Sequence, residues 1–256
     1  MEGEFAKARV EGEYESVKAI YEAMPHRVPK PHGWGKLSTK DAYFFVMDFV
    51  HIVENALPNS PLPSPKELGK VTAELHRSTT SPTGKYGFHV TTFDGVGRQD
   101  IQGWHDDWTT CFTKLYMGVY EQESERNGPK DAYDKAVTRT ISHVIPRLIG
   151  ALKDIHPVLL HGDIHEPNVG IHAITGQLYL FDAAAFYGHN ELEIGIWTTK
   201  HHKMSVNYSY VREYRKHIPP SEPAEESDDR IKLYATDREI VHAFDTPSTS
   251  PEMRSR

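Results

Sequence analysis

The N-terminal part of the chain has apolar residues spaced as on one face of an α-helix. They recur at steps of three and four residues, at Val10, Tyr14, Val17, Tyr21 and Met24. This spacing is typical of an amphipathic helix, and charged residues fill the opposite face. The pattern predicts a helix over residues 10–24, with Glu13 at the edge of its buried face.

Aromatic and β-branched residues dominate residues 43–50, a pattern typical of a buried strand. Prolines and glycines before it, in residues 28–35, indicate turns and extended chain. Four prolines within residues 57–65 indicate a connector. The chain therefore divides into a small mixed segment and a longer remainder.

Three apolar stripes predict three helices in the middle of the chain. The first begins at Ser64-Pro65-Lys66-Glu67, a capping-box pattern, and its apolar positions are Leu68, Val71 and Leu75. The second begins near residue 106, with Trp108, Phe112, Leu115 and Val119 on one side. The third covers residues 129–152 and is expected to bend at Pro146. Residues 78–103, rich in Gly, Thr and Pro, are expected to be mostly loop.

The C-terminal third contains two short apolar runs within residues 158–183. They flank a Thr175-Gly176 turn, which predicts a β-hairpin. Mostly helix is expected from there to about His242. The tail from Thr246 has no core-forming pattern and is expected to be disordered.

Composition and charge narrow the classes of protein. Of 256 residues, 38% are hydrophobic and 25% charged, which excludes a wholly disordered chain. The net charge of −7, without a basic run, argues against binding to nucleic acid or an anionic membrane. Cys111 is the single cysteine, so an internal disulfide is impossible. No apolar stretch is long enough to span a bilayer, and the first residues lack a signal-peptide pattern. We therefore expect a soluble cytoplasmic protein.

The residues with the clearest chemistry surround the predicted hairpin. Asp163 and Asn168 lie five residues apart on a loop after an apolar strand, and Asp182 ends the second strand. The hairpin should bring Asn168 and Asp182 together, and two hard oxygen donors suit Mg²⁺. Asp163 on the same loop can accept a hydroxyl proton. This set of residues fits phosphoryl transfer, and its spacing matches the kinase catalytic loop.

His161-Gly-Asp163 with Asn168 resembles the small-molecule branch of the kinase-like superfamily. The segment from Phe181 to Glu193, including Tyr187-Gly-His189-Asn-Glu191, is similar to a motif of the fructosamine kinase family, the ketosamine 3-kinases. Tyr86-Gly-Phe, Leu75-His76, the segment from Trp104 to Phe112 and Glu11-Gly-Glu-Tyr-Glu-Ser also resemble segments of that family. The resemblance extends in order from about Phe5 to Tyr234.

The resemblance implies a role for each matching residue. Asp163 would be the catalytic base, and Asn168 and Asp182 would hold Mg²⁺. Glu13 would pair with the lysine that contacts ATP, for which Lys7 is the candidate. Asp48, Phe49 and Val50 would form the hinge whose backbone meets adenine. The residues expected near the sugar are Trp104, Asp107, Trp108, His189 and Glu191.

Alternatives stay open for several of these residues. Trp104 and Trp108 can equally be core residues, and His189 a structural histidine. Glu13 can be an ordinary solvated helix residue. The run Lys200-His201-His202 is interpreted as solvated surface rather than a metal site, because no third ligand is visible.

The chain also departs from the family pattern. It has no glycine-rich loop, and Phe5-Ala-Lys7 resembles the end of the family's lysine-bearing strand only six residues before Glu13. Ala183 replaces a proline of the family beside Asp182. The chain thus resembles a kinase whose N-terminal strands are missing, and its true N-terminus stays open.

The sequence therefore predicts an α+β, protein-kinase-like two-lobed fold. Residues 1–50 would form a truncated N-lobe sheet, residues 51–245 a mainly helical C-lobe, and residues 246–256 a disordered tail. The expected activity is that of a Mg-ATP-dependent phosphotransferase for ketosamine small molecules or glycated protein amines. The sequence does not define the oligomeric state. One alternative is a pseudokinase that binds nucleotide or ketosamine without turnover. The other is a kinase of a different small alcohol, such as an aminoglycoside.

Overall fold

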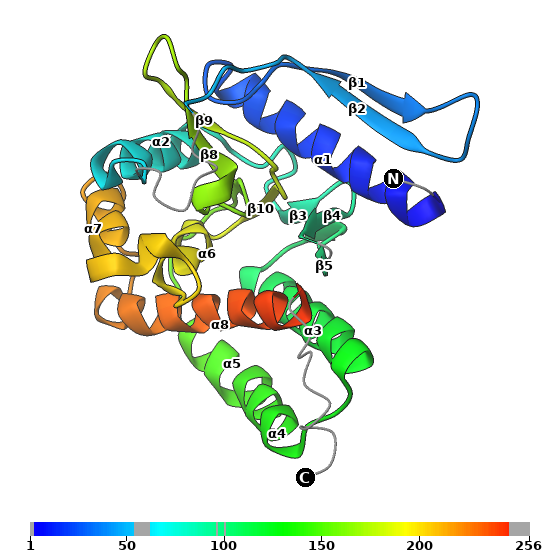
Figure 1. Cartoon of the computed structure of the whole chain (residues 1–256). Helices are drawn as coiled ribbons and strands as arrows, with labels where there is room; N and C mark the ends of the chain where they lie inside the picture. Colours follow the sequence, from blue (N-terminus) through cyan, green and yellow to red (C-terminus); the bar gives the residue numbers. More distant parts are fainter. Residues whose placement is uncertain (1–2, 54–61, 96, 100, 246–256) are drawn as a thin grey trace.

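The computed structural model describes residues 3–53, 62–95, 97–99 and 101–245. Its N-terminal part is one long helix, α1 (Gly3–Ala23), lying along a two-stranded antiparallel sheet, β1 (Pro31–Lys36) and β2 (Tyr43–Met47). Figure 1 shows this unit against one side of the remaining helices and short strands. Trp34 pairs with Phe45, so the register brings aromatic residues together across the two strands.

Helix α1 begins seven residues earlier than the apolar stripe predicts. The expected strand ending at Lys7 is therefore wrong, because Phe5, Ala6 and Lys7 are helical. Residues 3–10 include good helix formers such as Ala, Glu, Lys and Arg and no proline. Ala6 and Val10 are buried and extend the same apolar face that continues to Val17.

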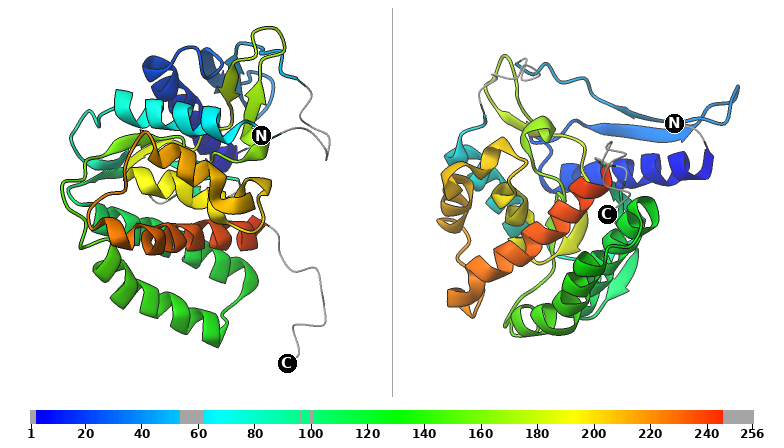
Figure 2. Two further views of the ribbon diagram at one scale, coloured as in Figure 1. Left: turned by 90° about the vertical axis from the view of Figure 1, so that its left-hand side faces the viewer. Right: turned by 60° about the horizontal axis from the view of Figure 1, so that its bottom comes forward.

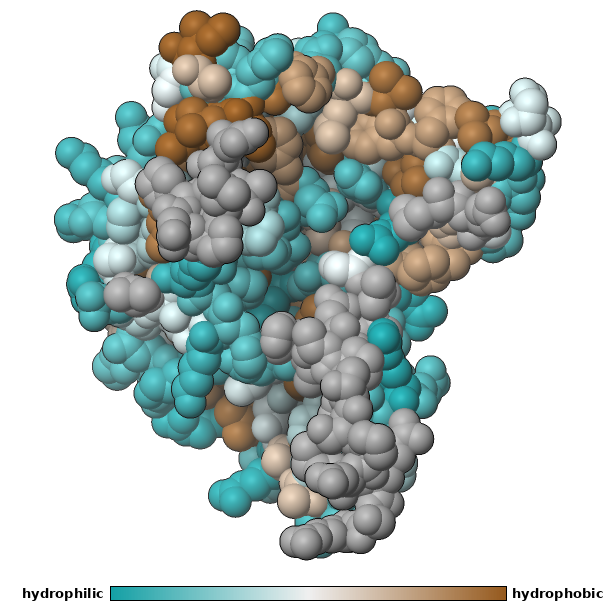
Figure 3. Space-filling model, in the orientation of Figure 1, coloured by the Kyte–Doolittle hydropathy of each residue, from teal (hydrophilic) through white to brown (hydrophobic). Residues whose placement is uncertain are grey.

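Strand β2 begins at Tyr43 as predicted but ends at Met47, three residues before the predicted end, and the expectation that it is buried is wrong. Phe44 is 40% exposed and Val46 is 49% exposed. A sheet of two strands packs one face on α1, and the other face has no described layer over it. Figure 3 shows apolar surface over this hairpin. The connector at residues 54–61 lies outside the described residues.

The central body begins with α2 (Pro65–Ser78), whose apolar positions Leu68, Val71 and Leu75 are all buried, as predicted. The capping box is not formed, because the Ser64 side chain makes no cap hydrogen bond. Residues 78–103, expected to be mostly loop, contain three strands of three residues each, and a fourth such strand begins at residue 103. These are β3 (Tyr86–Phe88), β4 (Thr92–Asp94), β5 (Gly97–Gln99) and β6 (Gly103–His105).

Two helical segments follow. The first, α3 (Trp108–Asn127), buries the predicted stripe of Trp108, Phe112, Leu115 and Val119. The second consists of α4 (Asp131–Arg139), η1 (Thr140–Val144) and α5 (Ile145–Leu148), and it ends four residues before the predicted end. Its middle part, η1, is a π-helical stretch that ends two residues before Pro146, the residue at which we expected the helix to bend.

The predicted hairpin is present as β8 (Val169–Ile171) paired with β9 (Leu178–Leu180). It projects from an antiparallel sheet in the order β6-β3-β10-β7, in which β7 (Val158–Leu160) pairs with β10 (Phe186–Gly188). The helices and helical turns around this region are η2 (Glu166–Asn168), α6 (Asn190–Gly195), η3 (Ile196–Thr198), η4 (Lys203–Tyr208), α7 (Ser209–Arg215), η5 (Ala224–Glu226) and α8 (Ser227–Asp245).

Helix α8 packs against several of the other helices. Figure 2 shows it between the α6–α7 region and the α4–α5 segment, and it also contacts α3. Its buried residues Ile231, Tyr234 and Ile240 join the main core. No helix in the described part of the chain has both the length and the apolar character needed to cross a membrane. The expected tail from Thr246 lies outside the described residues.

Candidate active site

The candidate site lies on the loop that leaves β7 and on the segment that returns to β10. Because these strands pair, with Leu160 opposite Phe186, the two segments begin and end side by side. The backbone N–H of Ala184 donates to the carbonyl of His161 at 2.9 Å and fixes this juxtaposition. Gly162 fits here because its φ is +86° and a Cβ would lie 2.2 Å from the carbonyl oxygen of Ala184.

Asp163 is buried at the centre of the loop. The Asn168 side-chain amide donates to the Asp163 carboxylate at 2.7 Å and to its backbone carbonyl at 3.0 Å. His165 Nε2 lies 3.3 Å from the same carboxylate. Burial alone would raise the pKa of Asp163, but the hydrogen bond from His165 and the charges of His165 and Arg238 lower it. The carboxylate is therefore ionised at neutral pH, the state in which it can accept a proton.

The hairpin brings Asn168 and Asp182 to the same end. The Phe181 backbone N–H donates to the Asn168 carbonyl at 2.9 Å, and Val169 pairs with Leu180. Because the Asn168 amide nitrogen is engaged by Asp163, its amide oxygen is the atom available to a ligand. Asp182 is exposed and has a left-handed φ of 53°. One amide oxygen and one carboxylate are hard donors that fit Mg²⁺.

Glu13 faces this end of the hairpin from α1. Burial and then the charge of Asp182 raise the pKa of Glu13 to about 7, against the opposing charge of Arg9. The described residues include no ion pair with Glu13. Lys7 lies on the same helix six residues earlier, about 240° around its axis, so the two side chains point to different sides.

The expected hinge residues follow β2. The Asp48 backbone N–H donates to the carbonyl of Lys30, and its carboxylate lies 2.6 Å from His32 Nε2. Residues Asp48, Phe49 and Val50 line a pocket of about 190 Å³ together with residues of α1, the following loop and the β8–β9 hairpin. That volume is below the roughly 300–1,000 Å³ of typical ligand pockets. Phe49 itself is 82% exposed.

The five residues expected near the sugar divide into two groups. Trp104 is half-buried on β6, with its ring 6.0 Å from that of Tyr187. Asp107 caps α3 by accepting from the Thr110 backbone N–H at 2.8 Å. Trp108, His189 and Glu191 are buried. The structure thus leaves Trp104 and Asp107 accessible and places the other three inside the protein.

A buried hydrogen-bonded chain accounts for the interior residues. Trp108 Nε1–H donates to the Tyr234 hydroxyl at 2.8 Å, and Tyr234 lies 2.9 Å from His189 Nδ1. His189 Nε2 lies 2.9 Å from the Ser221 hydroxyl. With the Tyr234 hydroxyl donating to His189 Nδ1 and His189 Nε2–H donating to the Ser221 hydroxyl, a neutral His189 completes both hydrogen bonds. Burial lowers the pKa of His189 to about 4, which favours this neutral form. Glu191 forms a separate buried pair with Arg230 at 2.7 Å.

Several side chains around Asp163 were not identified from the sequence. Glu193 accepts from the His161 and Gly162 backbone N–H groups. Arg238 on α8 forms a buried ion pair with Asp94 at the end of β4. Burial and then the charge of Asp163 raise the pKa of Asp94 to about 7, and Arg238 opposes them. These residues are up to 144 positions apart in the chain, so no local pattern connects them.

Comparisons with known proteins identify the family. The family model described as fructosamine kinase matches residues 3–243. The chain is 33% identical over 195 residues to a protein-ribulosamine 3-kinase of Oryza sativa subsp. japonica, covering 76% of this chain and 53% of the rice protein. It is 30% identical over 230 residues to the Arabidopsis thaliana protein of the same name, covering 89% of this chain and 65% of that protein. The chain therefore spans about half to two thirds of these relatives.

Solved structures show the fold. A putative fructosamine-3-kinase from Thermobifida fusca superposes with a TM-score of 0.70 at 18% identity, covering 93% of this chain and 74% of that one. An aminoglycoside phosphotransferase superposes with a TM-score of 0.62 at 16% identity, covering 91% of this chain and 74% of that one. The predicted α+β, kinase-like fold is therefore confirmed. The fold, the order of motifs and the family match together show that this chain belongs to the fructosamine kinase family.

Proposed function

We propose that the chain acts as a Mg-ATP-dependent phosphotransferase on a sugar hydroxyl of ketosamines, either small molecules or glycated protein amines. The observation that carries this proposal is the arrangement of Asp163, Asn168 and Asp182 on one loop and the adjoining hairpin end. The names of the rice and Arabidopsis relatives support the ketosamine class of substrate. ATP and Mg²⁺ are the cofactors that this chemistry requires.

Each residue has a defined part in the proposed reaction. Asn168 and Asp182 would hold Mg²⁺, which supplies charge neutralisation for phosphate oxygens. Asp163 would accept the proton of the sugar hydroxyl as its oxygen forms a bond to the γ-phosphorus and the bond to ADP breaks. Asn168 keeps the Asp163 carboxylate aimed by donating to it at 2.7 Å. His165 helps to keep that carboxylate ionised.

Replacing the base tests the proposal directly. We expect Asp163→Asn to lower ATP-dependent phosphorylation of a ribulosamine or fructosamine by roughly 10²- to 10⁴-fold, with nucleotide affinity nearly intact. The matched control is Asp229→Asn, because Asp229 is exposed on α8 and pairs with Lys232. A variant at Asp163 that keeps most of the wild-type activity would show that another group accepts the proton.

The metal assignment has its own test. Asp182→Asn should weaken binding of ATP in the presence of Mg²⁺ more than binding of ATP with a chelator present. The motivation is the position of the exposed Asp182 beside Asn168 at the hairpin end. Equal losses under the two conditions would contradict a role in holding Mg²⁺.

A second candidate function is a pseudokinase, a module that binds nucleotide or ketosamine without turnover. The observation that favours it is Glu13, which the described residues leave without an ion pair and with a pKa raised to about 7. Lys7 cannot supply the partner from the same helix in this geometry. Thermal shifts with nucleotide, with and without Mg²⁺, would detect binding. Binding together with no phosphate transfer from wild-type protein would identify the module.

A further inference from the structure

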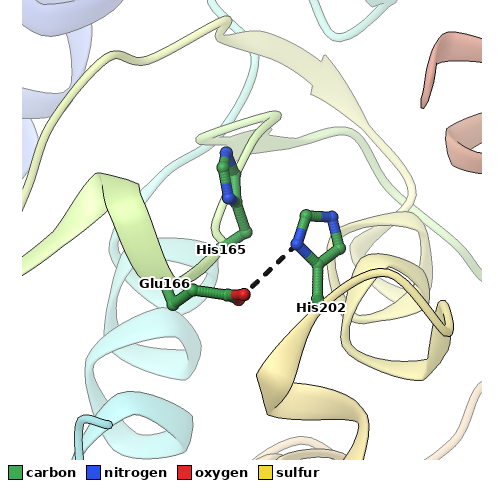
Figure 4. A group of neighbouring side chains, drawn as sticks. All are labelled: His165, Glu166 and His202. Carbon is green, nitrogen blue, oxygen red and sulfur yellow. Dashed lines mark ion pairs between the residues drawn. The ribbon is translucent and has the colours of Figure 1, made fainter. Parts of the chain in front are cut away.

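Three side chains with nitrogen and oxygen ligand atoms meet beside the catalytic loop. His165 and Glu166 follow Asp163 on that loop, and His202 comes from the turn before η4 (Figure 4). One ligand atom from each lies within 4.8 Å of the other two. A tetrahedral ion with bonds of about 2.0–2.2 Å has its ligands roughly 3.4 Å apart, so small rotations of the side chains would complete the site.

Two of the three ligand atoms make no hydrogen bond in the described structure. His165 Nδ1 and Glu166 Oε2 are buried atoms without a hydrogen-bond partner in the described structure. Glu166 Oε2 lies 3.5 Å from His202 Nδ1, and Figure 4 shows that carboxylate and that nitrogen pointing toward one another. The rings of His165 and His202 are 4.7 Å apart between centroids. Three donor atoms therefore converge on one small space.

The surroundings of the three side chains resemble the supporting shell of a metal site. Metal-binding histidines usually direct their second ring nitrogen to a carboxylate or carbonyl, which fixes the ring. His165 Nε2 faces the Asp163 carboxylate at 3.3 Å, and Glu166 Oε1 accepts from the Lys203 backbone N–H at 2.9 Å. The three side chains are each about one-fifth exposed.

We propose that His165, Glu166 and His202 form a binding site for a divalent transition-metal ion such as Zn²⁺, distinct from the Mg²⁺ site at Asn168 and Asp182. Two imidazoles and one carboxylate favour Zn²⁺ and related ions over Mg²⁺, which prefers oxygen ligands. Three protein ligands leave a fourth position for water. The ion would connect the catalytic loop to the turn before η4. Bound to His165 Nδ1, it would hold the Nε2–H toward Asp163.

The sequence predicted only solvated surface at Lys200-His201-His202, because no further ligand is visible near that run. The other two ligands lie about 37 residues earlier, on the catalytic loop. The neighbouring His201 points elsewhere, with its Nε2 2.7 Å from Glu239. His201 and His202 are thus adjacent histidines of which only His202 joins the cluster, and they form a matched pair for an experiment.

The test is calorimetric titration of the purified chain with Zn²⁺, repeated with Co²⁺ to record the visible absorption of the bound ion. We expect one saturable site in wild type, unaffected by millimolar Mg²⁺. His202→Ala and Glu166→Gln should each weaken it by roughly 10-fold or more, and His201→Ala should bind as wild type. Absence of a saturable site in wild type, or equal binding by all three variants, would overturn the proposal.

A thermal-shift series excludes misfolding as the cause of lost binding. With a chelator present, His202→Ala should melt within a few degrees of wild type, and added Zn²⁺ should stabilise wild type but not the variant. Stabilisation of both proteins to the same extent would overturn the proposal. These readouts use no nucleotide or sugar, so they stand whether or not the proposed phosphotransferase activity is found.

Discussion

A carboxylate oxygen of Glu193 lies 2.5 Å from the backbone nitrogen of His161, with both residues fully buried. The same carboxylate accepts from the Gly162 N–H at 3.1 Å and lies 3.6 Å from His76 Nε2. Glu193 of α6 thus holds the backbone at the start of the loop that carries Asp163. We call this set of hydrogen bonds to Glu193 the clamp. The position of Asp163 depends on it, because Asp163 is the next residue after Gly162.

Neutralising the clamp should weaken both the fold and the loop. In Glu193→Gln, one acceptor oxygen becomes a donor that faces backbone N–H groups, which leaves a buried donor unsatisfied. We expect a loss of about 2 kcal/mol in the free energy of unfolding, measured with urea, and lower activity. The exposed Glu225→Gln is the control and should stay within about 0.5 kcal/mol of wild type. Equal stability of the two variants would show that Glu193 does not hold the loop in place.

Gly162 should be sensitive to substitution for two separable reasons. Its φ of +86° disfavours any side chain, and a Cβ would lie 2.2 Å from the Ala184 carbonyl oxygen. Gly176 has a similar φ of +69°, but a Cβ there would meet no atom within 4 Å. We expect Gly176→Ala to cost about 1 kcal/mol of unfolding free energy and Gly162→Ala about 3 kcal/mol or more. Similar costs would mean that the loop shifts easily and that the close contact is unimportant.

The buried His189 predicts a dependence of stability on pH. Its pKa is about 4 in the folded protein and about 6.5 when unfolded, so the unfolded chain binds the proton first as pH falls. The stability from this group is therefore complete above pH 6.5 and is lost as pH falls toward about 4. The loss is roughly 3 kcal/mol.

Urea unfolding of wild type and His189→Gln between pH 7.5 and 4 measures this contribution. The variant cannot titrate at this position, so its stability should fall less steeply than that of wild type. Parallel curves for wild type and His189→Gln would show that His189 is not held neutral by burial.

Local patterns in the sequence identify the elements that local forces determine. The stripe Leu68, Val71 and Leu75 lies in the core of α2, and the turn at Thr175-Gly176 joins two paired strands. The position of Asn168 near Asp182 follows from that hairpin, so spacing alone could suggest it. A short segment between two paired strands restricts where its ends can be.

The sequence predictions are wrong or incomplete where contacts between distant residues determine the structure. Nothing near Lys7 shows whether residues 5–7 extend a helix or end a strand, because both patterns carry one apolar face. The exposure of Phe44 depends on how many layers cover the sheet, which its own sequence does not contain. His202 joins the catalytic loop only through the folding of the chain between them. Glu193 lies two residues after the recognised Glu191, yet its hydrogen bonds are to backbone N–H groups, which have no sequence signature.

The buried ion pair between Asp94 and Arg238 should contribute strongly to the stability of the fold. Both side chains are more than nine-tenths buried, and Arg238 also lowers the pKa of the nearby Asp163. In Arg238→Met, Asp94 would be left as a buried carboxylate without its cation, beside another carboxylate. We expect a loss of about 3 kcal/mol in the free energy of unfolding at pH 8. Adding Asp94→Asn should restore part of it, giving a coupling energy of about 1 kcal/mol or more in a double-mutant cycle.

The pH dependence of Arg238→Met tests whether the unpaired charge of Asp94 causes the loss of stability. Burial already raises the pKa of Asp94 to about 7, and removing Arg238 removes the charge that opposes this shift. The unfolded chain then loses the Asp94 proton at a lower pH than the folded chain, so rising pH favours unfolding. Arg238→Met should therefore be more destabilised at pH 8 than at pH 6, and the difference should vanish in Asp94→Asn/Arg238→Met. Additive effects at both pH values would mean that the two side chains act independently, and that Arg238 stabilises α8 through packing alone.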